Sequence, residues 1–344
     1  FLGGRKIGPW FTALSAEASD MSGYLLMGLP GLAYFSGAAD VGWTAIGLAC
    51  GTYLNWKLVA ARLRNYSVVA NDSITLPAFY SNRFHDEKQT VGTIAAVIIL
   101  IFFCVYVGSC FVTCGKLFNT LFGLDYAVMM VFGAIIVFLY TMVGGYLSVV
   151  ATDFVQGCLM FFALAVVVLG SIGMASGIEN AAAFLSDIPG YLSMTQTAVP
   201  VLDANGMQTV SNGAPLFGMP AEYGLLTIVS TLSWGLGYFG MPQVLVRFMG
   251  IRSAEEVKQS RIIAIVWVVI SMFCAVMIGL IGRAVIPTEL LTQSAAENIF
   301  IVLSRIMLPS LLCGIVVSGI LAASMSSASS YLLITGSSVA ENIF

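Results

Sequence analysis

Charge is scarce in this chain. Only 9% of its 344 residues are Asp, Glu, Lys or Arg, whereas soluble domains carry about 25%. The hydrophobic content of 59% exceeds what a water-soluble globule of this size can bury, so the excess apolar surface is expected to face a lipid bilayer. The net charge of −3 argues against a nucleic-acid partner, which would require a basic surface.

Metal-binding and acid–base side chains are also scarce. The chain has one histidine, His85, and its seven cysteines all lie in apolar runs without a Cys-x-x-Cys pair. This pattern argues against a zinc site and indicates buried, inert thiols. We therefore expect no enzyme built on a histidine centre and no organic cofactor.

Long hydrophobic runs dominate instead. About 20 apolar residues span a bilayer as a helix, and eight such stretches are present, the last long enough for a span plus a tail or a strongly tilted helix. An all-α multi-pass membrane protein is expected, because an open sheet edge is unstable in lipid. The stretches cover residues 10–35, 41–61, 91–119, 126–147, 150–176, 223–246, 259–286 and 299–338.

The basic residues predict an orientation. If the eight helices alternate from a cytoplasmic Phe1 end, 11 of the 14 Lys and Arg fall on the inner side or at inner helix ends. The polar loop 177–222 has no Lys or Arg and falls outside. This is the positive-inside asymmetry of a plasma (inner) membrane protein. The inner group is Arg5, Lys6, Lys57, Arg62, Arg64, Arg83, Lys88, Arg247, Arg252, Lys258 and Arg261, and the outer group is Lys116, Arg283 and Arg305.

The first span contains polar residues at mid-membrane depth. Glu17 and Asp20 are accompanied by three serines and Gly23. An acid at the bilayer centre costs about 2.5–3.5 kcal/mol, which ordinary packing does not offset. A helix break here would free backbone carbonyls, which are hard oxygen ligands suited to Na⁺. The alternative is a Ser/Gly-rich contact face with its acids near water.

The sixth span has a second break signal. Three glycines and Pro242 interrupt the apolar run from Ser233 to Gln243. Interrupted spans in matching positions of two halves point to a transporter site. Trp234 and Tyr238 lie four residues apart and share a helical face, which indicates either a cavity wall or an interfacial aromatic belt.

Hydroxyls gather in the eighth span, where five serines lie between Ser324 and Ser330. They could complete a sodium shell without adding charge, or simply allow close helix packing. Asp153 near the start of the fifth span is a third acid in or near the membrane interior. Its alternative role is a first-turn acid favoured by the helix dipole.

Together these segments resemble the sodium:solute symporter family, in particular its sodium/proline branch. The resemblance implies a LeuT-type five-plus-five inverted repeat in one transmembrane domain (1–344), with a first repeat at about 10–176 and a partial second repeat at about 223–338. Because the chain opens without Met and stops after a long helix, we expect a fragment of a longer protein. The most specific matching runs are Leu2–Arg5, Ser19–Gly23, Leu25–Gly31, Asn55–Ala60, Trp234–Gly240 and Ile320–Ala323.

The resemblance also implies three sets of site residues. A sodium ion is expected on the backbone carbonyls of Ala18, Met21 and Ala323 and the hydroxyls of Ser326 and Ser327, with Asp20 linked to sodium binding. A second sodium is expected on Asp153, Ser326, Ser329 and Ser330. A proline pocket is expected on Tyr24, Tyr106, Trp234, Tyr238 and Pro242, although Tyr24 stands where the branch typically has Trp.

The expected function is therefore sodium-coupled uptake of a small solute, proline, by alternating access. Two alternatives remain open: a symporter of the same family for another small solute, or a transporter-like sensor domain of a signalling protein. Na⁺, the solute and the lipid bilayer are the expected partners.

Overall fold

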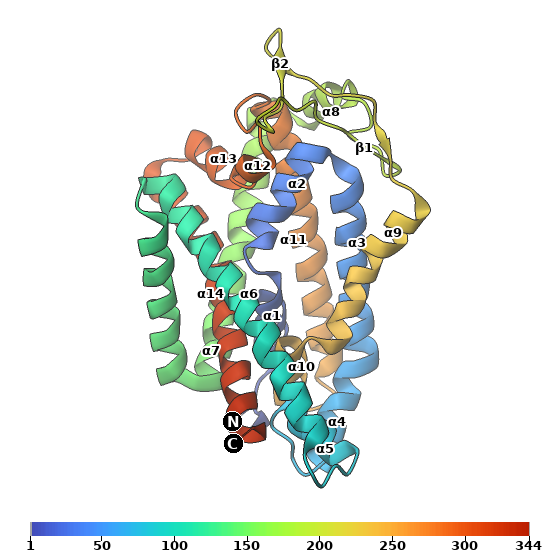
Figure 1. Cartoon of the computed structure of the whole chain (residues 1–344), viewed down its shortest axis with the longest axis vertical. Helices are drawn as coiled ribbons and strands as arrows, with labels where there is room; N and C mark the ends of the chain where they lie inside the picture. The colour runs from blue at the N-terminus through green and yellow to red at the C-terminus, as the bar shows by residue number, and fades with distance from the viewer. Residues whose placement is uncertain (1, 344) are drawn as a thin grey trace.

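The structure is a computed structural model that describes residues 2–343, and it is mostly helical (Figure 1). Its long helices form one bundle. In chain order the helices and helical turns are η1 (Leu2–Arg5), α1 (Pro9–Met21), η2 (Tyr24–Gly28), α2 (Leu29–Ser36), α3 (Ala38–Asn55), η3 (Trp56–Ala60), α4 (Ala61–Val69), α5 (Leu76–Arg83), α6 (Thr90–Phe122), α7 (Tyr126–Met174), α8 (Ile178–Ser186), α9 (Leu225–Leu232), η4 (Ser233–Gly240), α10 (Pro242–Gly250), α11 (Val257–Val285), α12 (Gln293–Ala296), α13 (Ile299–Met307) and α14 (Ser310–Asn342).

The predicted spans correspond to these helices. Among residues 2–343, four helices are long and apolar enough to cross a membrane: α6, α7, α11 and α14. The second predicted span is also helical throughout, because α3 continues through η3 into α4. The fourth and fifth predicted spans are joined in α7, which bends at Gly145. That residue has a φ of 58°, a conformation that glycine adopts without the steric cost of a side chain.

The eighth predicted span is divided. The sequence predicts one span with a tail, or one tilted helix, over 299–338. The structure instead ends α13 at Met307 and begins α14 at Ser310, so that prediction was wrong. Pro309 separates the two helices, and Leu308 before it is extended, with φ −112° and ψ 143°. A proline disfavours helical conformation in the residue that precedes it.

The loop 177–222 lies at one end of the bundle, opposite the end formed by α4, α5 and the last turn of α14 (Figure 1). It carries α8 and two antiparallel pairs of very short strands, β1 with β4 and β2 with β3. Tyr191 ties it to the bundle, since its hydroxyl donates to the carbonyl of Ala33 at 2.8 Å. Phe1, whose side of the membrane the sequence predicts, lies outside the described residues. The strands are β1 (Gln196–Thr197), β2 (Val210–Ser211), β3 (Ala214–Pro215) and β4 (Ala221–Glu222).

Large apolar side chains cover the outside of the bundle, and such a surface requires lipid or another apolar partner. The prediction that all seven cysteines are buried was wrong, because Cys50, Cys104 and Cys158 are exposed on this surface. Strongly exposed examples on α6 and α7 are Phe102, Val105, Leu139, Met142 and Val143.

Two arginines lie elsewhere than the charge distribution predicts. Arg247, assigned to the inner side, and Arg283, assigned to the outer side, are both fully buried within the structure. A buried guanidinium must be paired or hydrogen-bonded. Arg283 donates to the side-chain oxygen of Gln208 and so attaches the end of α11 to the loop. The partners of Arg247 are described with the site.

Candidate functional site

The first helix is broken where the sequence predicts. α1 ends at Met21, and Ser22 leaves the helical region with φ 48° and ψ −170°. The chain resumes as the single turn η2. Two hydrogen bonds hold the break: the Tyr106 hydroxyl donates to Ser22 Oγ at 3.2 Å, and the Tyr24 backbone N–H donates to the same oxygen at 3.3 Å.

The sixth span is broken in the same manner. α9 ends at Leu232 and is followed by the tighter turns of η4, an extended Met241 (φ −77°, ψ 106°), and α10 beginning at Pro242. Glycine lets η4 approach α3 closely: a Cβ added at Gly235 would lie 2.0 Å from the carbonyl oxygen of Gly47. Both predicted breaks are therefore confirmed.

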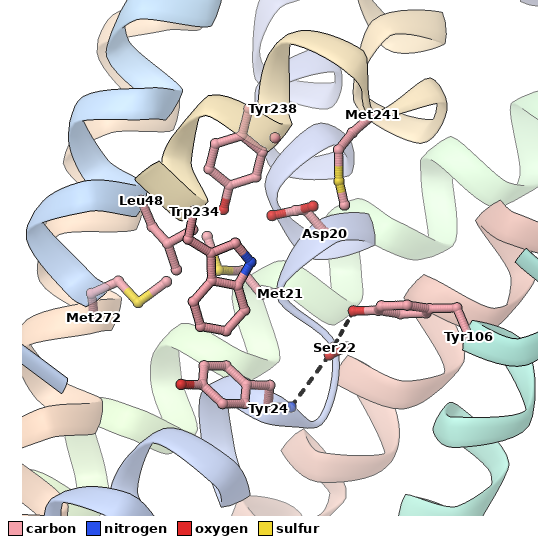
Figure 2. A pocket seen from close by; sticks show the side chains of 11 residues that line it. Asp20, Met21, Ser22, Tyr24, Leu48, Tyr106, Trp234, Tyr238, Met241 and Met272 are labelled. Carbon is pink, nitrogen blue, oxygen red and sulfur yellow. Dashed lines mark hydrogen bonds between the residues drawn. The ribbon is translucent and has the colours of Figure 1, made fainter. Parts of the chain in front are cut away.

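A cavity of about 130 Å³ lies between the two breaks. A single water needs roughly 10–15 Å³ by this measure, so the cavity has room for a small solute. Figure 2 shows that aromatic rings from separate elements converge on it, with Tyr24 and Trp234 centred 5.3 Å apart. Four predicted pocket residues line the cavity, Tyr24, Tyr106, Trp234 and Tyr238, together with Asp20, Met21, Ser22, Leu48, Gly237, Met241 and Met272.

Pro242 is not among the residues that line this cavity. It is the first residue of α10, a position where its missing N–H and fixed φ suit the start of a helix. The preceding residue, Met241, lines the cavity instead. Sequence reasoning also missed Leu48 and Met272, because an apolar residue in an apolar span gives no signal of facing a cavity.

Asp20 brings a carboxylate to the cavity wall. Gln243 donates to its Oδ1 at 3.2 Å, and the Tyr238 hydroxyl points toward the carboxylate (Figure 2). The same Gln243 nitrogen donates to the Tyr331 hydroxyl at 2.9 Å. Asp20 is thus held by α10 and faces the space that a solute would enter.

The residues predicted for the first sodium meet where α14 crosses α1. Ser326 Oγ donates to the carbonyl of Ala18 at 2.7 Å and to that of Ala323 at 3.1 Å. The last four carbonyls of a helix have no partner within it; in α1 these include the carbonyl of Ala18, which accepts from Ser326, and that of Met21. Ser327 Oγ is buried and has no hydrogen-bond partner within residues 2–343.

This oxygen set fits a sodium ion. The donors are neutral carbonyls and hydroxyls, which are the hard ligands that Na⁺ accepts. They lie at the C-terminal end of α1, where the helix dipole favours a cation. Met21 belongs both to this set and to the cavity wall, so the two places are contiguous. The assignment of the ion to these residues stays a prediction.

The residues predicted for the second sodium are arranged differently. Asp153 Oδ2 accepts from Ser15 Oγ at 2.7 Å and from Arg247 Nη2 at 3.0 Å. Ser330 contacts the same guanidinium and carboxylate. Ser329 turns away and donates to the carbonyl of Ser326 at 3.1 Å. The contribution of Arg247 was missed, because a count of charges along the chain carries no information on depth.

The model of the sodium:solute symporter family matches residues 1–344. The chain belongs to this family. A sodium/proline symporter of Staphylococcus aureus is 40% identical over 349 aligned positions, which cover 100% of this chain and 62% of the relative. The sodium/proline symporter of Staphylococcus aureus strain JH9 matches with the same identity and coverage. The chain therefore spans less than two thirds of the length of these curated relatives.

A solved structure of a Na⁺-coupled sialic acid symporter, in a substrate-bound outward-open state, has a similar fold. The TM-score is 0.75 at 18% identity, over 100% of this chain and 68% of that one. The family resemblance and the LeuT-type fold class predicted from the sequence are thus confirmed. Membership of a symporter family also indicates a transporter rather than an enzyme.

Proposed function

We propose that this chain forms the transporting core of a sodium-coupled symporter for proline. One observation carries the proposal: the Ser326 hydroxyl of α14 donates to the Ala18 carbonyl at the end of α1, and that helix end reaches an aromatic cavity through Met21. The hydroxyl of the next residue, Ser327, is buried and has no hydrogen-bond partner within residues 2–343. Oxygen atoms suited to a sodium ion and a cavity with room for a small solute thus meet at the same helix break. The names of the 40% identical relatives support proline as the solute.

Sodium is a co-substrate in this scheme. The carbonyls of Ala18, Met21 and Ala323 and the hydroxyls of Ser326 and Ser327 would hold it. The hydroxyl proton of Ser326 now points to a carbonyl, and rotation about its C–O bond would turn the oxygen toward an ion. Ligands from both α1 and α14 would order the broken end of α1, and with it Met21 and Ser22 at the cavity.

Proline suits the cavity chemically. Its secondary ammonium group complements the Asp20 carboxylate, and its apolar ring would pack on the faces of Trp234 and Tyr238. Its carboxylate would meet backbone N–H groups that the two helix breaks expose. Tyr24 keeps an aromatic face where the branch typically has Trp. Its ring packs against Trp234.

Transport would follow by alternating access. We infer two repeats, at about 10–176 and 223–338, that rock around the contiguous ion and solute sites. Ion and solute favour the same conformations, so coupling is a difference in affinity between states. One Na⁺ entering down 100 mV supplies about 2.3 kcal/mol and a tenfold gradient about 1.4 kcal/mol. Together they support accumulation of a few hundred-fold.

We place the protein in the plasma (inner) membrane with the Phe1 end cytoplasmic. The loop 177–222 has no Lys or Arg, and it lies opposite the end where α4 and α5 carry several basic residues. Cysteine introduced at Asn205 should react with an impermeant maleimide in intact cells, whereas cysteine at Lys88 should react only after permeabilisation. The reverse pattern would invert the assignment.

Proline uptake into liposomes tests the function. The full-length protein would be reconstituted and labelled proline uptake measured with and without an inward Na⁺ gradient, in the wild type and in Asp20→Ala and Ser327→Ala. Gradient-dependent uptake that both substitutions abolish would support the proposal. Sodium-dependent transport of another solute would refute only the proline assignment. Absence of sodium dependence for every solute would favour the sensor alternative.

A further inference from the structure

Arg247 and Asp153 form an ion pair in the middle of the bundle. Their side chains are both 0% exposed, and Nη2 lies 3.0 Å from Oδ2. Asp153 comes from α7 and Arg247 from α10, so the pair joins the first predicted repeat to the second. It occupies the place where the family resemblance implies a second sodium ion.

The guanidinium nitrogens of Arg247 donate hydrogen bonds to residues of four helices. Nε donates to Ser15 Oγ of α1 at 3.0 Å, Nη1 to the Gln243 carbonyl of its own helix at 3.1 Å, and Nη2 to both Asp153 and Ser330. Its carbon also lies 5.7 Å from the centre of the Tyr146 ring, within cation–π range. These contacts hold the guanidinium of Arg247 in one position and orientation, so it is an integral part of the site at Asp153.

The oxygen donors available to a second ion are few. Of the four predicted ligands, only Asp153 and Ser330 face the same point, and both already contact Arg247. Ser326 is turned to Ala18 and Ser329 to its own helix. Asp153 Oδ1 has no hydrogen-bond partner in the described part of the chain, so one carboxylate oxygen remains.

The charges of Asp153 and Arg247 argue against a sodium ion at Asp153 Oδ1. Asp153 and Arg247 together are neutral, and a sodium ion there would place a second cation beside the guanidinium in a medium of low dielectric. Like charges repel strongly under those conditions. We propose that the guanidinium of Arg247 takes the place of a second sodium ion at Asp153, so that the carrier couples one sodium ion to each solute.

The inference rests on the proposed function and specifies it. The Arg247 guanidinium, which is covalently part of α10, would supply the positive charge that a second sodium ion would otherwise supply at Asp153. Unlike a sodium ion, it would not be transported. Removing the guanidinium would leave Asp153 with a free Oδ1 and an unpaired charge, which is a site for a monovalent cation. Arg247→Gln is therefore expected to create a second sodium site at Asp153.

Equilibrium binding of radiolabelled Na⁺ to the purified full-length protein, without solute, tests this directly. The wild type should bind one ion and Arg247→Gln two. Asp153→Asn combined with Arg247→Gln should return the count to one, because the carboxylate is gone. Arg283→Gln is the matched control: it also removes a fully buried guanidinium, but one at the loop, and it should leave one ion bound.

Two results would overturn the inference: two ions on the wild type, or one ion on a folded Arg247→Gln protein. If Arg247→Gln alone does not fold, the neutral double variant decides. One ion with wild-type affinity would support the inference, whereas no ion would show that Asp153 is a ligand of the first sodium. No sodium binding to the wild type would instead refute the proposed function.

Discussion

The Ser326 hydroxyl donates a hydrogen bond to the Ala18 carbonyl at 2.7 Å, across 308 residues of sequence. The Ala18 carbonyl lies in the last turn of α1, so this bond joins α14 to the end of the helix that the break at Ser22 creates. Sodium bound to the same oxygens would join the two helices at the same place.

Ser327→Ala tests whether an ion makes that contact. It removes a hydroxyl that has no hydrogen-bond partner among residues 2–343, so the substitution should weaken sodium binding without breaking a described contact of the protein. We expect sodium affinity to fall by roughly 10- to 100-fold, equivalent to about 1.5–3 kcal/mol for a polar bond to a charge. The sodium concentration for half-maximal proline uptake measures it. Ser324→Ala is the control, because Ser324 is also buried and its hydroxyl donates to the Ile320 carbonyl of its own helix at 3.1 Å.

The local signals for this site could be predicted from the sequence. Ser22-Gly23 in the first span and Gly240 with Pro242 in the sixth disfavour helix for reasons internal to a few residues, and both breaks are present. Ser326 of the α14 serine cluster contacts α1, and the row of small hydroxyl residues in an apolar helix predicts such a helix contact. Chemistry and chain position were sufficient for these features.

Depth within the bundle could not be predicted. Arg247 follows five residues after the start of α10, and it is buried because this short helix packs against α1, α4 and α14. Leu48 and Met272 line the cavity because of the way in which α3 and α11 pack. No local sequence pattern predicts that packing. Such features depend on which helices pack against each other, and a single sequence carries little of that information.

Asp20→Asn tests whether the Asp20 carboxylate binds the solute or the sodium ion. Asparagine keeps the shape and the contact with Gln243, but it loses the charge that faces the cavity. We expect proline affinity at saturating sodium to fall by roughly 10- to 100-fold, with a smaller change in sodium binding measured without proline. Isothermal titration of the purified protein gives both values. An equal loss of both affinities would assign Asp20 to the ion.

Pro242 and Met241 offer a paired test of the cavity wall. Met241→Ala removes apolar contact with a bound solute, so proline affinity should fall several-fold, for a loss of about 1 kcal/mol. Pro242→Ala should leave proline affinity nearly unchanged, because Pro242 does not line the described cavity. Its effect should appear in the thermal unfolding temperature, since proline restrains the unfolded chain by about 0.4–1 kcal/mol. A large loss of proline affinity in Pro242→Ala would instead show that Pro242 contacts the bound solute.

Gly235→Ala tests the contact that positions the second break. A Cβ at this residue would lie 2.0 Å from the Gly47 carbonyl oxygen, and one at Gly51 would lie 2.2 Å from the Gly235 carbonyl oxygen. Both neighbours are backbone, so neither can move aside as a side chain could. Overpacking of this kind costs about 1–3 kcal/mol, and because Trp234 is the adjacent residue, displacement of η4 from α3 should also weaken proline binding.

Gly240→Ala is the matched control in the same turn, since a Cβ there meets no described atom within 4 Å. Its unfolding temperature should stay the same or rise slightly, because alanine restricts the unfolded chain. Unfolding of both variants would be followed in detergent by the same fluorescence probe. If Gly235→Ala proved as stable as Gly240→Ala, η4 would not rest on α3 in the dominant state, and the cavity between the two breaks would be wider than about 130 Å³.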